Sequence, residues 1–457
     1  MRLFIIAFLG TFLFSGCLTG PTSTNVPTPI SAKPTNQVST YYVSTGLGSD
    51  HHPGSKNQPW KTIQKAANTV RAGDTIIVET GTYPERVKVA RSGNSATPIT
   101  YQADGHVTMN GFTVKADYIT IKGFEITDTP NDDIDGMGIY VAGNFCDLEN
   151  NYVHYATRGG IYLELGTNSC KIINNKLERN SQFGIVVHGN NSVIENNEIW
   201  GTIQYHPKWI TPPSYVDADG IHFFGSGHLF RGNYIHDISL SQPENTNPHI
   251  DAFQTWDGKA EGPAGSNSIF EQNKIVLGDA TTGFQLEGGT HNLVIRNNII
   301  EAFVGINAHK NSSSPYTVPA NLFILNNDWI GSLNYERSEY PEGISFENTV
   351  NSMIHNNIFA EQRDQVIFIK NSTGIDTDYN LAYNSDGSLP EGPFNIHDLW
   401  GVNPLFANPQ AGDYHLQAGS PAIEAGKTES QVTNDYESNP RPPDRGYDIG
   451  AYEYIGP

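Results

Sequence analysis

Two short stretches of the sequence share a pattern of acidic and polar residues that could carry out acid–base chemistry. In DADGIHFFG, Asp219 precedes His222, and in HIDAFQTWDG, Asp251 precedes Gln254 at the same spacing. An imidazole can take or give a proton near neutral pH, and two carboxylates can divide those roles or bind a cation. The two stretches are either one repeat unit of the fold or two halves of a single site.

The stretches belong to a longer series of repeats. Segments such as IINNKL, IENNEI, FEQNKI and ILNNDW recur, and their second polar position forms a column: Asn151, Asn175, Asn197, Asn233, Asn273, Asn298, Asn327 and Asn357. The spacing is roughly 22 to 30 residues where no insertion intervenes. Such repeats of short alternating strands predict an all-β, right-handed parallel β-helix, in which each rung buries apolar residues on the next, about 4.8 Å away.

Alignment of the second strand of each repeat predicts two outward-facing columns. The first reads Tyr140, Tyr162, Val186, His222, Gln254, Gln285, Asn307 and Ser345, and the second reads Ala142, Glu164, His188, Phe224, Trp256, Glu287, His309 and Glu347. Hydrogen-bonding groups beside aromatic rings suit sugars, which have polar edges and apolar faces. The predicted substrate-binding residues are His188, Gln254, Trp256, Gln285, Asn307, Lys310 and Tyr162. The alternative is an ordinary polar outer surface.

The catalytic candidates lie on the same columns and at the starts of their strands. They are Asp219, His222, Asp251, His249, Glu287 and His309. Carboxylates on neighbouring rungs would bind a cation or raise each other's pKa, so calcium held by Asp217, Asp219 and Asp251 is expected, with Asp257 and Asp279 as further oxygen donors. If side chains alternate strictly between the core and the surface along each strand, Asp219 and Asp251 point inward. They would then only cap turns.

Two insertions, residues 202–218 and 239–250, enter the strands that carry these aspartates. Long loops on a repeat scaffold usually carry binding, so Trp209 and Tyr215 are candidate sugar platforms. Packing within the loops is the alternative role for both rings.

The N-terminus predicts export. Residues 1–17 combine one Arg, a short apolar run and LFSGC, which resembles a lipoprotein signal with Cys17 as the lipidated residue. Residues 18–40 are rich in Pro, Thr and Ser, as in an extended linker. The formal net charge of −21 argues against nucleic acid as a partner. We expect a monomer at the cell surface or in the periplasm, in contact with the membrane only through the lipid.

The remaining segments complete the domain plan. In PWKTIQKAANTVRAGD, residues Ile63, Ala66, Ala67 and Val70 share one face of a short helix that would cap the open apolar end of the β-helix. The β-helix is expected over 41–395 and a closing segment packed on it over 396–457. Cys146 and Cys170 hold equivalent positions in two rungs, which favours stacked core thiols, with a disulfide as the alternative.

The stretch YYVSTGLGSD followed by PWKTIQKAANTVRAGDTIIVETGTYPERV resembles the N-terminal region of pectate-lyase-like, single-stranded right-handed β-helix proteins. The tail NPLFANPQAGDYHLQAGSPAIEAG is similar to a segment that closes many exported β-helix proteins. The resemblance implies action on polysaccharide and a Lys or Arg base beside Asp-bound calcium. Here Lys259 and Lys310 lie only near the outward columns, which departs from that pattern.

These observations favour a lyase that cleaves an acidic, uronate-containing polysaccharide by β-elimination. A glycoside hydrolase with paired carboxylates is the first alternative, since Asp219 with Asp251, or either with Glu287, could flank a scissile bond. A non-catalytic surface protein that binds carbohydrate is the second, because fold alone does not decide function.

Overall fold

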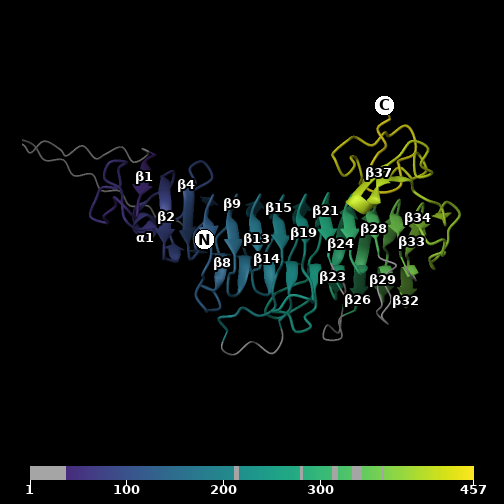
Figure 1. Ribbon diagram of the computed structural model, residues 1–457, viewed down its shortest axis with the longest axis horizontal. Coiled ribbons are helices and arrows are strands. Elements are labelled where there is room, and N and C mark those ends of the chain that lie inside the picture. Colours follow the sequence, from purple (N-terminus) through teal and green to yellow (C-terminus); the bar gives the residue numbers. More distant parts are fainter. Residues whose placement is uncertain are drawn as a thin grey trace, which may run out of the picture. The chain divides into compact units, whose positions relative to one another are not determined.

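A computed structural model describes residues 38–209, 216–277, 281–310, 317–331, 342–362 and 365–456, with only the backbone described at Glu342. The predicted signal peptide, Cys17, most of the predicted linker, Tyr215 and Asp279 lie outside the described residues. The described part of the chain contains no helix with the length and apolar character that a membrane span requires. Within it, the chain folds as the predicted right-handed parallel β-helix (Figure 1).

Each rung contributes three short strands, so the strands stack in three parallel ladders. The first two ladders are joined in a 24-stranded sheet, and the third forms an 11-stranded sheet. The first ladder comprises β6 (Ile119–Lys122), β9 (Asp147–Glu149), β12 (Lys171–Ile173), β15 (Val193–Glu195), β18 (Leu229–Arg231), β21 (Ile269–Glu271), β24 (His291–Arg296), β27 (Ala320–Leu325), β30 (Met353–His355) and β33 (Asp376–Asp378). The second comprises β7 (Glu125–Ile126), β10 (Tyr152–His154), β13 (Lys176–Glu178), β16 (Glu198–Trp200), β19 (Tyr234–His236), β22 (Lys274–Val276), β25 (Ile299–Glu301), β28 (Asp328–Ile330), β31 (Ile358–Ala360), β34 (Leu381–Tyr383) and β35 (Leu399–Trp400).

The 11-stranded sheet carries the first outward column predicted from the repeats, and the second column lies within its strands or directly after them. Its strands are β3 (Val87–Val89), β5 (Phe112–Val114), β8 (Met137–Val141), β11 (Gly159–Leu163), β14 (Phe183–Val187), β17 (Asp219–Phe223), β20 (Asp251–Thr255), β23 (Thr282–Glu287), β26 (Val304–His309), β29 (Glu342–Glu347) and β32 (Gln365–Lys370). The long strands β2 (Thr75–Tyr83) and β4 (Ile99–Met109) lead into the 24-stranded sheet after β1 (Thr40–Val43). The first strand thus begins at the last residue of the predicted linker.

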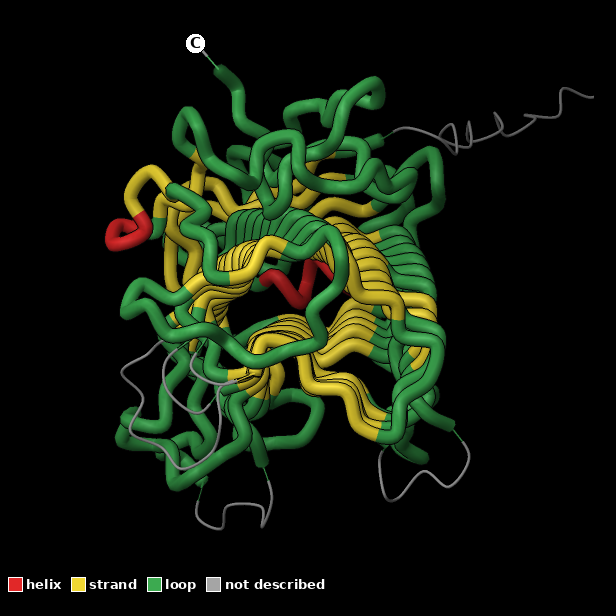
Figure 2. Tube along the Cα trace, turned by 90° about the vertical axis from the view of Figure 1, so that its right-hand side faces the viewer, coloured by secondary structure: helices red, strands yellow, loops and turns green. Residues whose placement is uncertain are grey.

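The helix α1 (Ile63–Thr69) covers the N-terminal end of the core, as predicted from its apolar face. Viewed from the other end, it lies behind the stacked rungs (Figure 2). Thr62 caps the helix by accepting a hydrogen bond from the Lys65 N–H, and the Glu85 carboxylate accepts two more from the N–H groups of Ile63 and Gln64. These contacts satisfy backbone donors that the first turn of a helix leaves free, so the cap is held from both sides.

A ladder of buried asparagines satisfies the backbone at one bend of every rung. Asn273, for example, accepts the N–H of Asn233 at 3.0 Å and donates to the carbonyl of Phe230 at 3.0 Å and to Oδ1 of Asn298 at 2.9 Å. The same pattern runs through the predicted column from Asn151 and continues to Asn380. The residue before each ladder asparagine has a left-handed backbone conformation, with positive φ. Asparagine tolerates positive φ, and this explains the recurrent Asn-Asn pairs.

Replacing Asn273 by alanine should therefore lower the free energy of unfolding by about 3 kcal/mol, because several buried backbone groups lose their partners at once. Chemical denaturation measures this loss. Asn57→Ala is the control, since Asn57 is exposed on a turn and should change stability by less than about 0.5 kcal/mol. Equal stability of the two variants would contradict a structural role for the ladder.

Cys146 and Cys170 are both free thiols with no exposed surface. They precede β9 and β12 directly, and the pairing of Lys171 with Asp147 places them on neighbouring rungs. The stacked-thiol interpretation of the sequence is confirmed in this structure.

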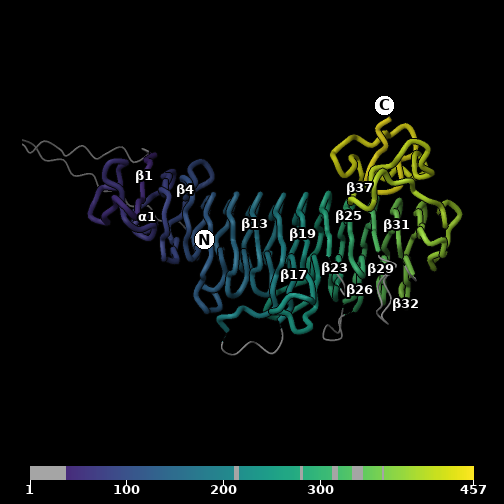
Figure 3. Tube along the Cα trace, viewed as in Figure 1, coloured from purple at the N-terminus to yellow at the C-terminus, as the bar shows by residue number. Residues whose placement is uncertain are grey.

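The C-terminal segment packs on the side of the last rungs and does not extend the stack. It contains β36 (Phe406–Asn408), the 3-10 helix η1 (Pro409–Ala411) and β37 (Asp413–Leu416). Its apolar residues form one cluster with residues of β25, β31 and β34. The ribbon and the Cα trace draw the segment next to these strands (Figures 1 and 3). Strand pairing itself continues to β35, beyond the predicted domain boundary at residue 395.

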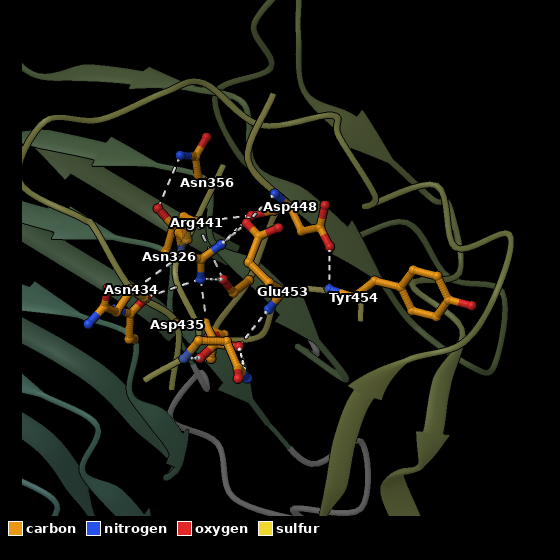
Figure 4. A network of polar contacts seen from close by, with 12 residues as sticks. Asn326, Asn356, Asn434, Asp435, Arg441, Asp448, Glu453 and Tyr454 are labelled. Atoms are coloured by element: carbon orange, nitrogen blue, oxygen red, sulfur yellow. Dashed lines mark hydrogen bonds and ion pairs between the residues drawn. The ribbon is translucent and has the colours of Figure 1, made fainter. Parts of the chain in front are cut away.

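A buried polar network joins the C-terminal segment to the rungs (Figure 4). The Arg441 guanidinium pairs with Glu453 at 2.8 Å and also donates to Asn297 Oδ1 at 3.1 Å and to the Gly450 carbonyl at 2.8 Å. Neither side chain of the ion pair exposes more than 4% of its surface. Because the pair is buried and the guanidinium donates both to the segment and to the rungs, it fixes where the segment sits on the strands.

Asp328 on β28 makes the same junction sensitive to pH. Its Oδ1 accepts the Ala451 N–H at 3.1 Å, its Oδ2 has no hydrogen-bond partner, and burial raises its pKa to about 7. Since the folded-state pKa lies above the unfolded value of about 3.9, this group stabilises the fold below about pH 4, and that stabilisation is lost as the pH rises to about 7.

Asp328→Asn keeps the size and the accepting oxygen but cannot ionise. The stability of the natural protein relative to this variant should therefore fall as the pH rises from about 4 to about 7. Thermal unfolding of both proteins across that range measures the difference. The same change at the exposed residue Asp104 should produce no such trend, and a pH-independent difference for Asp328→Asn would refute the assignment.

Candidate functional site

The strand register of the 11-stranded sheet agrees with the alignment of the repeats. His222 pairs with Gln254, Gln254 with Gln285, and Gln285 with Asn307. Their side chains alternate with core residues that have no exposed surface, such as Ile221. The outer face of β17, β20, β23 and β26 therefore presents one imidazole and three amides in consecutive rungs.

Asp219 and His222 form a hydrogen-bonded pair at the start of this series. Asp219 Oδ2 lies 2.7 Å from His222 Nε2, and Asp219 Oδ1 accepts the Asp251 N–H at 2.7 Å. Asp219 is fully buried, whereas His222 exposes 13% of its side chain. The sequence left open whether Asp219 points inward or outward; the structure buries it and turns its carboxylate to the histidine that faces out.

Burial sets the protonation of this pair. Desolvation, with a smaller contribution from the Asp217 charge, holds the pKa of the Asp219 carboxyl well above its usual value. Desolvation lowers the pKa of His222 to about 4. The imidazole is therefore neutral near pH 7, and because Nε2 faces Asp219, Nδ1 is the nitrogen left for a substrate.

Asp251 is the second buried carboxyl of the site. Only 2% of it is exposed, and its Oδ2 has no hydrogen-bond partner. Burial is the main cause that raises its pKa well above the usual value, and the charges of Asp219, Asp217 and Glu287 raise it further, against a hydrogen bond from Thr282. A carboxyl that remains protonated near neutral pH can donate a proton to a substrate.

The predicted calcium site does not fit this geometry. Both oxygens of Asp219 are engaged by His222 and by the Asp251 backbone, and Asp217 accepts the His249 N–H at 3.3 Å. Among the described residues no group of three or more acidic, His or Cys side chains is arranged to hold a metal ion. Asp257, expected as a further donor, instead accepts hydrogen bonds from Ala264 N, Gly289 N and Thr317 Oγ1. Two of the three predicted ligands, Asp217 and Asp219, therefore accept backbone hydrogen bonds.

The amide and carboxylate groups beyond Asp251 remain on the outer face. Gln254 and Gln285 are buried to more than 90%, and Gln254 Oε1 has no hydrogen-bond partner. Gln285 donates to Glu287 Oε1 at 3.2 Å, and Glu287 pairs along the ladder with His309. His309 Nδ1 also has no hydrogen-bond partner and is hidden from solvent. Asn307 is half-buried in the same face, and Lys310 follows β26 as an exposed residue.

At the N-terminal end of the predicted outward columns, the side chains pack against one another. His188 exposes only 2% of its surface, donates a hydrogen bond from Nδ1 to the Leu163 carbonyl, and stacks on Phe224 with ring centroids 4.7 Å apart. Trp256 packs edge-on against both Phe224 and His222. His188 and Phe224 therefore do not form the open surface that the sequence predicted, because the segment after Trp256 folds back and Ala264 pairs with Phe224.

Other predicted residues lie at the edges of this region or outside it. Tyr162 is half-buried and stacks on Tyr140, at 5.8 Å between centroids, and burial raises its pKa to about 12. His249 is exposed in the loop before β20, where its backbone N–H donates to Asp217. Trp209 is 9% exposed beneath the Arg158 guanidinium, which supports the loop-packing alternative for that ring.

The structure adds Glu261, which the sequence analysis missed. It lies in a hairpin closed by two hydrogen bonds between Gly258 and Gly262, and its charge acts on Tyr162, His188 and His222. No strand periodicity could place it, because the hairpin returns to the sheet by a path that only the tertiary fold defines. The sequence signal was limited to two glycines, Gly258 and Gly262, four residues apart.

Comparisons with known proteins agree with this architecture. A family model described as Pel9A-like, right handed beta helix region, matches residues 41–232, and one described as right handed beta helix region matches residues 138–338. The Bacillus subtilis (strain 168) protein YwoF is 32% identical over an alignment that covers 22% of this chain and 25% of that protein. The chain thus matches about a quarter of the length of that relative.

Solved structures with the same fold include several enzymes that act on carbohydrates. XylC, solved with xylose, aligns with a TM-score of 0.59 at 14% identity over 91% of this chain and 98% of XylC. Pectate lyase Pel9A aligns with a TM-score of 0.50 at 17% identity over 92% and 97% of the two chains. The lacto-N-biosidase of Eubacterium ramulus gives 0.52 at 14% identity over 75% and 67%. At these identities the likeness shows the fold. The chain therefore carries a right-handed parallel β-helix, as both family models describe.

Proposed function

We propose that the protein is a carbohydrate-active enzyme, and specifically a lyase that cleaves a uronate-containing polysaccharide by β-elimination on the outer face of β17, β20 and β23. The observation that carries the proposal is the 2.7 Å contact between Asp219 and a histidine that burial keeps neutral. β-Elimination needs a base for the proton next to the carboxylate, and a neutral imidazole oriented by a carboxyl group is such a base.

The proposed reaction moves two protons. His222 Nδ1 takes the C5 proton of the uronate, the C5–H electrons form the C4–C5 double bond, and the bond from C4 to the glycosidic oxygen breaks. The reaction requires the form of the pair in which Asp219 is ionised and accepts the Nε2 proton, because only then is Nδ1 free to take the C5 proton and is the resulting imidazolium stabilised by the carboxylate. The leaving oxygen takes a proton from Asp251, because burial raises the pKa of this carboxyl and favours its protonated form.

The amides of the next rungs suit the substrate carboxylate. Gln254, Gln285 and Asn307 lie on consecutive strands and carry N–H donors without adding charge. Uncharged donors in a nearly dry site stabilise the negative charge that develops toward the carboxylate during C5 deprotonation. The half-buried Asn307 forms the open end of this series.

A glycoside hydrolase remains a second candidate because of one specific pair. Asp251 has a free Oδ2 and a pKa that the Glu287 charge helps to raise, which is the electrostatic relation between a general acid and its partner carboxylate. Asp219 does not suit that role, since both of its oxygens are already engaged.

Two variants separate these candidates. In the lyase, Asp251→Asn should reduce turnover by about a hundredfold or more, whereas Glu287→Gln should reduce it far less, since Glu287 transfers no proton. In the hydrolase both variants should be nearly inactive. Glu347→Gln, further along the same column, is the control. Product analysis completes the test, because only a lyase releases sugars with an ultraviolet-absorbing double bond.

We further propose that the protein is exported, anchored by a lipid on Cys17, monomeric and free of other membrane contacts. Incorporation of labelled fatty acid that Cys17→Ser abolishes would support the anchor, and unchanged labelling would refute it. The calcium expected from the sequence has no site among the described residues, and turnover that is unaffected by a chelator would exclude it.

A further inference from the structure

A cavity of about 630 Å³ lies between the C-terminal segment and the outer face of the second ladder. Its floor includes three side chains on consecutive strands, because Ile330 of β28 pairs with Ala360 of β31 and Ala360 pairs with Tyr383 of β34. The small Ala360 side chain leaves room between the two larger ones. The volume falls within the range of about 300 to 1,000 Å³ that is typical of sites for small ligands. None of the lining residues belongs to the 11-stranded sheet, so the cavity is separate from the face that carries His222.

The C-terminal segment forms the opposite wall of the cavity and is held by its own contacts. Phe406 and Tyr414 pack edge to face with ring centroids 5.2 Å apart, and the Tyr414 hydroxyl donates to Glu301 of β25 at 2.9 Å. The backbone N–H of Gln417 donates to the Leu405 carbonyl at 2.9 Å, and its Nε2 donates to the Phe406 carbonyl at 2.8 Å. Because these contacts fix the wall, binding has to order little of the chain.

Leu405 lines the cavity in a backbone conformation that leucine rarely adopts. Its φ is 53°, in the left-handed region, and 37% of its surface is exposed. Asn403 Oδ1 accepts the Leu405 N–H at 2.8 Å, and Gln417 holds the Leu405 carbonyl, so the surrounding contacts impose this conformation. Residues held in such sparsely populated regions cluster at sites that clamp a ligand.

The uncharged polar groups around the cavity suit the hydroxyls of a sugar. The Tyr383 hydroxyl accepts a hydrogen bond from Asn403 Nδ2 at 3.2 Å and keeps its own proton to donate. The side-chain amide of Gln410 also lines the cavity and has no hydrogen-bond partner among the described residues. These groups stand beside the rings of Tyr383, Phe406 and Tyr414. Donors and acceptors next to aromatic surface match the polar edges and apolar faces of a sugar ring.

The charge of the cavity disfavours an acidic sugar. Within the described part of the chain, its lining contains no Lys, Arg or His. Its one carboxylate, Glu361, accepts hydrogen bonds from Ser385 N at 3.1 Å and from Ser385 Oγ at 2.8 Å. A uronate placed here would meet a negative charge and no cation, whereas a neutral sugar meets no repulsion.

We propose that this cavity is a second carbohydrate site, which binds a neutral saccharide. It rests on the proposed function only in taking carbohydrate as the ligand, and it does not depend on the lyase reaction. A neutral stretch of polysaccharide bound here keeps the enzyme close to its substrate, because two linked sites raise the effective concentration of the chain at the outer face of β17, β20 and β23.

The test is calorimetric titration of the full chain with xylohexaose, cellohexaose, mannohexaose and trigalacturonate. At least one neutral hexasaccharide should bind, and Tyr383→Phe should weaken its binding by about threefold to tenfold, the effect of losing one hydrogen bond. Ser385→Trp should weaken it by about tenfold or more, because an indole at this exposed position fills the cavity. Tyr118→Phe is the matched control, since it removes the same hydroxyl from a half-buried tyrosine before β6 and should leave binding unchanged. Thermal unfolding checks that each variant folds.

Failure of all three neutral hexasaccharides to bind would overturn the proposal, as would unchanged binding in Tyr383→Phe or an equal loss in Tyr118→Phe. Binding of trigalacturonate that weakens in Tyr383→Phe would contradict the neutral character of the site. The titration requires no turnover. A protein that cleaves no uronate but binds a neutral sugar through Tyr383 therefore retains this site and rejects the lyase, and cleavage without neutral-sugar binding does the reverse.

Discussion

Replacing His222 by alanine should lower turnover by between about a hundredfold and ten-thousandfold, the usual contribution of a general base. The loss follows from removing an imidazole that is both hydrogen-bonded to a buried carboxyl and directed to the outer face. The fold should survive, because the core of β17 is formed by Ile221 and Phe223 on the opposite side of the strand. Steady-state rates and thermal unfolding together measure both effects.

His51→Ala is the matched control for this variant, since His51 is exposed near the N-terminal cap. Its turnover should equal that of the natural protein. Asp219→Asn tests the other half of the pair and should also be strongly impaired, because an amide stabilises the imidazolium less well than a carboxylate. Full activity in His222→Ala would remove the proposed base, whatever the effect of the Asp219 change.

Replacing Arg441 by methionine should cause the largest loss of stability, about 3 to 5 kcal/mol. Methionine retains much of the side-chain volume, but it leaves Glu453 buried without its counter-charge and removes the donors to Asn297 and Gly450. The change should first loosen the C-terminal segment from the rungs. Limited proteolysis after β35, followed by denaturant unfolding, measures this loss.

Arg445→Met is the matched control, because Arg445 and Glu424 form an ion pair that is about half exposed in the same segment. Surface pairs contribute little, so this variant should lose less than about 1 kcal/mol. The double variant Arg441→Met with Glu453→Gln should recover part of the loss, since it leaves no buried charge unpaired. No difference between Arg441→Met and Arg445→Met would contradict the role given to the network.

The sequence predicted the scaffold well because its periodicity carries the register. The Asn151 to Asn357 column could be aligned without a structure, and one alignment also placed His222, Gln254, Gln285 and Asn307 on successive rungs. A shift by one residue would exchange core and surface, so the apolar pattern leaves little choice.

The periodicity of the sequence does not determine the side-chain directions and long-range contacts of the site. Asp219 and Asp251 stand at strand starts, where alternation no longer decides the direction of a side chain, and only the structure shows Asp219 bound to His222. The burial of His188 and the place of Glu261 both result from a hairpin that folds back from a later rung. Such long-range returns leave no regular spacing in the sequence.

The proposed β-elimination is tested most directly by product analysis. The protein is incubated with pectate, alginate, glycosaminoglycans and neutral xylans, each with calcium or with a chelator. We expect the natural protein to release sugars with an ultraviolet-absorbing C4–C5 double bond from at least one uronate polymer. His222→Ala should not form them. New reducing ends without that absorbance would contradict the lyase in favour of the hydrolase. Binding without any cleavage of these polymers would contradict both.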